Sequence, residues 1–202
     1  AWAPFLERYR YQLPSLHNGL IPDDDRVYPH LAAWYRVMDN VPAYACRVKG
    51  DASSWRKVLT MAGFGNSGVP PNIVDAMEER IAWEEEQASQ SRGAEELWTE
   101  YATMNPHVGK TASAEAARII AKNRMALVSD CLKHTTTLDS DHEVDEALRQ
   151  LASTLQSGNT DHIANRSKVG HIAATIDKRM CVPRDMGALS ATCIKKIALD
   201  RQ

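Results

Sequence analysis

Apolar residues recur at spacings of three and four along most of the chain, whereas few segments alternate apolar and polar residues with a period of two. A spacing of three and four gathers side chains on one face of an α-helix, so the pattern predicts an all-α fold. The clearest stripe consists of Val144, Leu148, Leu151 and Leu155, which step by four, three and four positions. We expect this stripe to be the buried face of its helix.

Prolines, glycines and capping residues set the ends of the predicted helices. Pro29 and Pro42 each fit a first helical turn, where the missing N–H removes no hydrogen bond, and Pro14 is expected to end the influence of the first helix. Ser113 is expected to cap one helix, and Asp141 or a neighbour to cap the next. The predicted helices cover residues 1–11, 29–40, 42–48, 52–61, 71–89, 94–103, 113–133, 142–157, 162–179 and 188–199.

A stretch rich in glycine and proline near residues 63–71 interrupts the helical pattern. We therefore expect three regions: a helical domain over residues 1–62, a linker with a long helix over 63–110, and a helical extension over 111–202. Short polar turns connect the last four helices, which favours their packing as a small antiparallel bundle.

Composition excludes several classes of protein. The 24 basic and 26 acidic residues give a net charge of −2 without a basic block, so nucleic acid is not an expected partner. No apolar run approaches the ~20 residues of a membrane-spanning helix, which leaves docking at a membrane surface open. The four cysteines are widely spaced and form no C-x-x-C pair, which indicates neither a zinc site nor a disulfide framework and favours a reducing compartment.

Two patterns resemble ligand-binding motifs but lack their context. Gly63–Gly68 matches G-x-G-x-x-G, yet the preceding segment is predicted to be helical, so a flexible turn is favoured over a nucleotide site. Four acids are spaced as in a calcium loop: Asp139, Asp141, Glu143 and Asp145. Val144 and Gln150 occupy the positions that need glycine and glutamate, so helix capping is the preferred interpretation. Asp23–Asp25 is similarly interpreted as a solvated loop.

The histidines do not form a recognisable metal motif. They lie at positions 17, 30, 107, 134, 142, 162 and 171, with no H-E-x-x-H and no close pair on one helical face. A zinc site is therefore not predicted. Ligation of a chlorophyll magnesium by one of them stays an alternative, although an ordinary surface or capping role is favoured.

Two groups of residues resemble a known family. The segment Tyr28–Tyr44, with its two proline-started helices, and Phe5–Tyr9 before it are similar to the end of the all-helical C-terminal domain of cytosolic-type glutathione transferases, over about residues 1–48. Gly50–Leu59 and Val182–Met186 resemble the long extension carried by a chloroplast branch of that family in plants and algae. The resemblance implies a partial glutathione transferase-like domain followed by a second helical bundle.

The resemblance implies the fold but not the reaction. In that family a thioredoxin-like N-terminal domain activates the thiol of glutathione, whereas the helical half mainly supplies an apolar pocket and cannot do so alone. We expect this sequence, which starts at Ala1, to begin inside a helix and to lack the thiol-binding domain. No catalytic, cofactor-binding or metal-ligating residue is therefore predicted, and glutathione would bind only if the missing domain is present.

Aromatic residues crowd the first third of the chain, and those that face missing helices would expose an apolar surface. The predicted partner interface consists of Trp2, Phe5, Tyr9, Tyr11 and Trp55. We expect a non-catalytic scaffold or linker subunit, peripheral to the membrane, docked on a chloroplast photosystem–antenna supercomplex on the stromal side of the thylakoid. The alternative is the C-terminal portion of a chloroplast glutathione transferase that conjugates glutathione to electrophiles.

Overall fold

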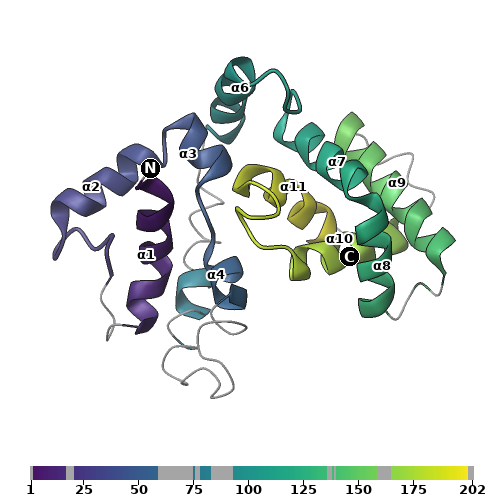
Figure 1. Ribbon diagram of the computed structural model, residues 1–202, viewed down its shortest axis with the longest axis horizontal. Helices are drawn as coiled ribbons and strands as arrows, with labels where there is room; N and C mark the ends of the chain where they lie inside the picture. Colours follow the sequence, from purple (N-terminus) through teal and green to yellow (C-terminus); the bar gives the residue numbers. More distant parts are fainter. Residues whose placement is uncertain are drawn as a thin grey trace. The chain divides into compact units, whose positions relative to one another are not determined.

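The computed structural model describes residues 2–16, 21–58, 75, 78–82, 93–135, 138, 140–158 and 165–199. Within these ranges every regular element is a helix, which confirms the all-α prediction (Figure 1). Contacts between residues divide the chain into two compact units. Unit 1 comprises Ala1–Leu97 and Cys181–Ala188, and unit 2 comprises Trp98–Met180 and Leu189–Gln202.

Within described residues 2–16 and 21–58, unit 1 contains four helices. They are α1 (Ala3–Leu16), α2 (Pro29–Met38), α3 (Pro42–Arg47) and α4 (Ala52–Val58). Pro29 and Pro42 stand at the start of α2 and α3, as predicted. The predicted end of the first helix is wrong, because α1 continues through Pro14 to Leu16. Pro14 lies two residues from the end of α1, so the hydrogen bond that its missing N–H removes belongs to the last turn.

The chain returns to unit 1 late in the sequence. Cys181–Ala188, which we call the return segment, belongs to unit 1 although the helices on either side of it lie mainly in unit 2. Its residues Cys181, Val182 and Met186 are buried. A hydrogen bond inside the segment links Asp185 to Cys181, because the Asp185 carboxylate accepts a 2.8 Å bond from the Cys181 amide. Residues 181–188 therefore complete a unit that begins at the other end of the chain.

Unit 2 is built around one central helix. Its elements are α7 (Ala112–Lys122), α8 (Arg124–His134), α9 (Asp141–Ser157), α10 (Arg166–Arg179) and most of α6 (Ala94–Met104) and α11 (Ala188–Leu199). α9 packs against α7, α8 and α10 (Figure 1). Val144, Leu148, Leu151 and Leu155 are all buried, which confirms the predicted core stripe.

Two details of the bundle differ from the prediction. The single helix predicted over 113–133 is divided at Asn123, which ends α7 and precedes α8. The cap of α7 is Thr111 rather than Ser113, since the Thr111 hydroxyl accepts a 3.0 Å bond from the Ala114 amide. Ser113 lies inside the helix and donates to the Leu155 carbonyl at 2.7 Å, which ties α7 to α9. Ser140, next to Asp141, caps α9.

Candidate functional site

A buried carboxylate lies on the inner side of α1. Glu7 is only 1% exposed, its Oε1 accepts a 2.8 Å hydrogen bond from the Gly50 amide, and its Oε2 accepts one from the Tyr44 hydroxyl. Burial raises the pKa of Glu7, although the nearby Arg10 guanidinium and both hydrogen bonds act in the opposite direction. Glu7 therefore joins α1 to α3 and to the loop between α3 and α4.

A buried guanidinium lies one turn further along the same side of α1. Arg10 is 7% exposed and donates to both carboxylate oxygens of Asp39, at 3.1 and 3.2 Å, and to Asp23 at 2.9 Å. Burial by itself lowers the pKa of Arg10, but the hydrogen bonds to Asp39 and the electrostatic attraction of Tyr11, Asp39 and Glu7 together outweigh it, so the pKa is raised and the guanidinium stays charged. Lys49 adds a second cation 3.1 Å from Asp39.

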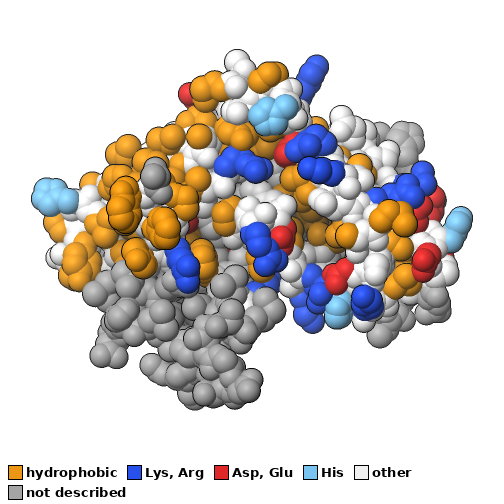
Figure 2. Space-filling view, in the orientation of Figure 1, with side chains coloured by type: hydrophobic (Ala, Val, Ile, Leu, Met, Phe, Trp, Pro, Cys, Tyr) orange, Lys and Arg blue, Asp and Glu red, His pale blue; other side chains and the backbone are white. Residues whose placement is uncertain are grey.

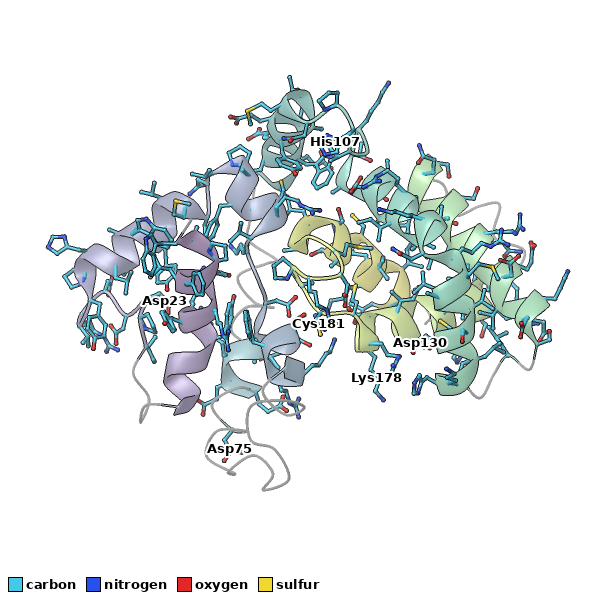
Figure 3. All side chains as sticks on the ribbon, viewed as in Figure 1. Asp23, Asp75, His107, Asp130, Lys178 and Cys181 are labelled. Atoms are coloured by element: carbon cyan, nitrogen blue, oxygen red, sulfur yellow. The ribbon has the colours of Figure 1, made fainter. Side chains whose placement is uncertain are left out.

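Asp23 closes this cluster from the loop before α2. It accepts from Arg80 at 2.8 and 3.3 Å in addition to Arg10, and its position is labelled in Figure 3. Burial tends to raise the pKa of Asp23, but Arg80 and Arg10 together lower it. Asp23 is thus a partly buried ion-pair partner, and the interpretation as a solvated loop is wrong for this residue. We call Glu7, Arg10, Asp23, Asp39 and Tyr44 the inner network.

Tyrosines complete the surroundings of the inner network. The Tyr35 hydroxyl donates to the Leu6 carbonyl at 2.5 Å, and the Arg10 guanidinium lies 4.8 Å from the centre of the Tyr35 ring. Burial raises the pKa of Tyr35 and of Tyr44, so both hydroxyls stay protonated and act as donors. The charged groups therefore find their partners inside unit 1.

The opposite side of α1 carries aromatic side chains. Trp2, directly before α1, and Phe5 and Tyr9 on it are 77%, 53% and 44% exposed. The Trp2 carbonyl accepts a 3.1 Å bond from the Leu6 amide, and the helical repeat of 3.6 residues, extended to Trp2, places the mean direction of the three about 160° from that of Glu7, Arg10 and Tyr11. Figure 2 shows hydrophobic side chains gathered over the part of unit 1 that contains α1 and α2. We call Trp2, Phe5 and Tyr9 the outer aromatic face. α1 thus buries Glu7 and Arg10 on one side and exposes Phe5 and Tyr9 on the other, with Trp2 beside them.

The two remaining residues of the predicted interface lie elsewhere in unit 1. Tyr11 is buried, and its hydroxyl donates to the Gly50 carbonyl at 3.2 Å. Its ring stacks on the half-buried Trp55, with ring centres 6.2 Å apart. The structure therefore brings three of the five predicted interface residues together on one exposed face and places the other two in a stacked pair.

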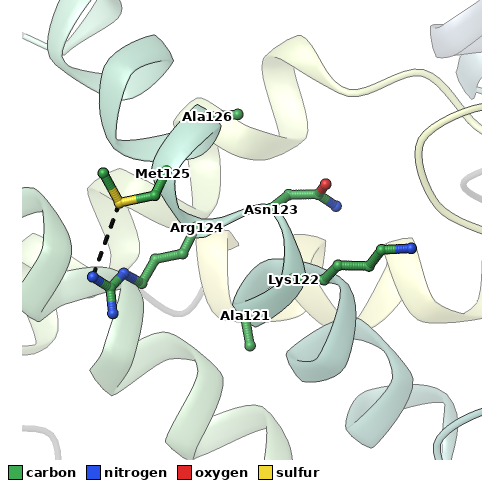
Figure 4. Close-up of a pocket in the computed structure, with 6 residues that line it drawn as sticks. All are labelled: Ala121, Lys122, Asn123, Arg124, Met125 and Ala126. Carbon is green, nitrogen blue, oxygen red and sulfur yellow. Dashed lines mark hydrogen bonds between the residues drawn. The ribbon is translucent and has the colours of Figure 1, made fainter.

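Two shallow hollows lie among the described residues. One of about 420 Å³ lies at the junction of α7 and α8, where Arg124 pairs with Asp145 at 2.8 Å and lies 4.0 Å from the Met125 sulfur (Figure 4). The other, of about 340 Å³, adjoins Asp23 and Arg80. In the second hollow Asp23 pairs with Arg80 and Asp24 pairs with Arg26, whereas the first is lined by Lys122 and Arg124 without an acidic side chain. Neither lining combines a nucleophile with a base.

Three of the four acids of the calcium-like pattern, Asp141, Glu143 and Asp145, lie on a helix rather than in a loop. Asp141 and Glu143 are in the first turn of α9, where they compensate the helix dipole. Glu143 pairs with Lys168 at 2.6 Å, and Asp145 pairs with Arg149 at 2.9 Å. Asp139 and the glycine motif at 63–68 lie outside the described residues. In the described parts of the chain, no three His, Cys, Asp or Glu side chains come together in a way that could hold a metal ion.

The cysteines are free thiols. Cys46, Cys131 and Cys181 are buried and Cys193 is half-buried. Burial raises the pKa of Cys46 and of Cys131 to about 11, which keeps both thiols protonated and poorly nucleophilic at neutral pH. Separately, none of the helices in the described ranges combines the length and the apolar content that a bilayer crossing requires.

The comparisons with known proteins add no relative. No family model matches the sequence, and no match was found among the curated proteins or the solved structures. The glutathione transferase resemblance and the chloroplast location therefore stay predictions.

The sequence interpretation missed the inner network. Its local signal was present, because Glu7 and Arg10 are opposite charges three positions apart within an aromatic-rich helix. Asp23 and Asp39 could not be paired with Arg10 from sequence alone, since they lie 13 and 29 positions away.

Proposed function

We propose that this chain is a non-catalytic helical docking subunit, and that the outer aromatic face of α1 contacts a protein partner in a larger assembly. The observation that carries the proposal is the orientation of α1. A surface helix normally buries its apolar stripe and exposes its charges, whereas here Trp2, Phe5 and Tyr9 are exposed while Glu7 and Arg10 are buried.

Aromatic residues are well suited to this role. Fully burying a large apolar side chain contributes ~1.5–3 kcal/mol, and tryptophan and tyrosine are enriched among the residues that dominate the energy of protein interfaces. Three such side chains at spacings of three and four form one continuous stripe, which matches the way a helix presents its contacts to a groove. A partner that covers Trp2, Phe5 and Tyr9 would therefore gain substantial binding energy.

The inner network supports a structural rather than a chemical role. Glu7 accepts hydrogen bonds on both oxygens, and Arg10 is engaged by Asp39 and Asp23. Groups that are satisfied by neighbouring residues hold a fold together and are poorly placed to bind or activate a substrate.

For the assembly itself we propose a chloroplast photosystem–antenna supercomplex, with this chain as a peripheral scaffold or linker on the stromal side of the thylakoid. This part of the proposal is supported by the resemblance of Tyr28–Tyr44 and Val182–Met186 to the chloroplast branch of the glutathione transferase family. The conjugation of glutathione by a longer gene product is the competing function.

The test uses the full-length product in the organism that encodes it. Tagged wild type is compared with the triple variant Trp2→Ser, Phe5→Ser, Tyr9→Ser on density gradients of gently solubilised thylakoids. The matched control changes three exposed apolar residues of unit 2, Met104→Ser, Met125→Ser and Leu199→Ser, which are 59%, 73% and 68% exposed.

We expect wild type and control to migrate with photosystem–antenna complexes and the triple variant to remain at the top of the gradient. Wild type at the top would rule out the proposed assembly, and a triple variant that still migrates with the complexes would rule out the proposed face. Retention of the full-length product on a glutathione resin, with conjugation of an electrophile, would favour the transferase function instead.

A further inference from the structure

We infer that the inner network fixes the rotation of α1 about its own axis and so decides which of the two faces of the helix points outward. The importance of this orientation rests on the proposed docking function, but the orientation itself can be tested on the isolated protein. Glu7 and Arg10 are thus assigned as positioning residues for the outer aromatic face.

Either of two faces of α1 could be buried against the rest of unit 1. One carries Trp2, Phe5 and Tyr9, and the other carries Glu7, Arg10 and Tyr11. Hydrophobicity alone favours turning the aromatic stripe inward, because burial of apolar area is the main non-directional driving force of folding. Some other interaction must therefore hold α1 in the orientation that the structure shows.

The inner network supplies that interaction. A half-turn of α1 would withdraw Glu7 from the Gly50 amide and the Tyr44 hydroxyl, both of which are buried. The same rotation would withdraw Arg10 from Asp39 and Asp23, which would then keep Lys49 and Arg80, respectively, as their described cationic partners. Buried polar groups left without a partner are more unfavourable than an ordinary hydrogen bond is favourable, so the rotated state is opposed.

Directional contacts also explain why one orientation is selected. The bidentate contact between the Arg10 guanidinium and the Asp39 carboxylate requires one relative orientation of the two groups, whereas apolar packing tolerates several arrangements. Buried polar groups are known to fix register at some cost in stability. The Tyr35 ring, 4.8 Å from the Arg10 guanidinium, further restricts the position of that side chain.

The experiment is residue-resolved hydroxyl-radical footprinting of the isolated full chain, read by mass spectrometry at Trp2, Phe5 and Tyr9. The test variant is Glu7→Gln with Arg10→Gln, which removes both charges and keeps two polar side chains of similar length. The matched control is Asp24→Asn with Arg26→Gln, an ion pair of unit 1 whose arginine side chain is 85% exposed and which makes no contact with α1 in the described hydrogen bonds.

We expect oxidation at Trp2, Phe5 and Tyr9 to fall at least threefold in the test variant, because the aromatic stripe turns inward, and to stay at the wild-type rate in the control. A test variant that keeps its helical circular dichroism and oxidises at the wild-type rate would overturn the inference. If the test variant loses helicity, the same footprinting is done on Arg10→Lys. This variant keeps the positive charge but cannot make the bidentate contact with Asp39. Reduced oxidation then supports the inference, and unchanged oxidation overturns it.

Failure of this test is distinct from failure of the proposed function. Footprinting is done without a partner, so unchanged oxidation would leave the migration of wild type on gradients unaffected. Loss of migration on gradients would equally leave the footprint unaffected.

Discussion

The backbone amide of Val182 donates a buried hydrogen bond of 2.8 Å to the hydroxyl of Ser54, although 128 positions separate the two residues. Ser54 lies on α4, and Val182 lies in the return segment. Both belong to unit 1, so a piece of chain that follows α10 is part of the packing around α3 and α4. The stability of unit 1 should therefore respond to changes on either side of this bond.

Ser54→Ala is expected to destabilise unit 1 by about 1–3 kcal/mol, because it leaves the buried Val182 amide without its acceptor. The neighbouring Ser53, which is half-buried, provides the matched control Ser53→Ala. Hydrogen exchange of unit 1 amides, measured by mass spectrometry, should speed up about fivefold or more in the first variant. Equal exchange in the two variants would contradict the role given to this bond.

Gly187→Ala tests the other anchor of the return segment. A Cβ at position 187 would lie 2.0 Å from the Cys46 carbonyl oxygen, and a backbone atom cannot move away as the tip of a side chain can. We expect a loss of about 3 kcal/mol, the upper end of the usual range for overpacking, seen as a lower denaturation midpoint for unit 1.

The control for this variant is Gly158→Ala. Position 158 has φ of 69°, but no atom lies within 4 Å of the added Cβ. Only the backbone conformation is strained there, for which a loss of about 1–2 kcal/mol is expected. A Gly187→Ala protein as stable as wild type would show that the return segment is not held tightly against α3.

The sequence predicted those features that depend on neighbours along one helix. The buried stripe from Val144 to Leu155 could be predicted because four aliphatic side chains repeat with the helical period. Pro29 and Pro42 indicated helix starts because proline fits the first turn. The break at Asn123 was missed, since the apolar spacing continues across it while the backbone leaves the helical region, at φ −101° and ψ 13°.

Features that depend on distant partners could not be predicted. The aromatic stripe of α1 has the same spacing as a core stripe, so periodicity alone would bury it. Its exposure was predicted from partner helices expected to be missing, and not from the contacts of Glu7 and Arg10. What exposes it is the set of partners for Glu7 and Arg10 that α2, α3 and the loops supply. The return segment is a similar case, because nothing in Val182–Met186 itself indicates contact with Ser54.

Leu148→Asp should unfold unit 2. Leu148 is fully buried on α9, and the variant combines the loss of a core leucine, ~2–5 kcal/mol for truncation alone, with the burial of a carboxylate. Circular dichroism should show loss of helicity or a strongly lowered midpoint. Ser153→Asp, on the exposed side of the same helix, should melt close to wild type. An unchanged melt for Leu148→Asp would refute the packing of α9.

Glu7 makes a specific prediction about pH. Its pKa in the folded protein is raised above the ordinary value of 4.5, mainly by burial, so the folded state binds this proton more tightly than the unfolded state does. The resulting stability is fully present below pH 4.5 and is lost as pH rises through the raised pKa. The difference in unfolding free energy between wild type and Glu7→Gln should therefore decline as pH rises. Urea titrations across this range would contradict the assignment if the difference increased.

Asp23 should behave in the opposite way within the same network. Its folded pKa lies below the ordinary value of 3.8, because Arg80 and Arg10 outweigh the effect of burial. Its contribution is present above pH 3.8 and is lost as pH falls through the lowered pKa, so the stability difference between wild type and Asp23→Asn should shrink on acidification. The stability differences for Glu7→Gln and Asp23→Asn should therefore change with pH in opposite directions. Such opposite slopes would distinguish a carboxyl whose pKa is raised by burial from one whose pKa is lowered by ion pairs. Parallel slopes would mean that both carboxyls respond to the same influence, which would contradict the contacts that the structure gives them.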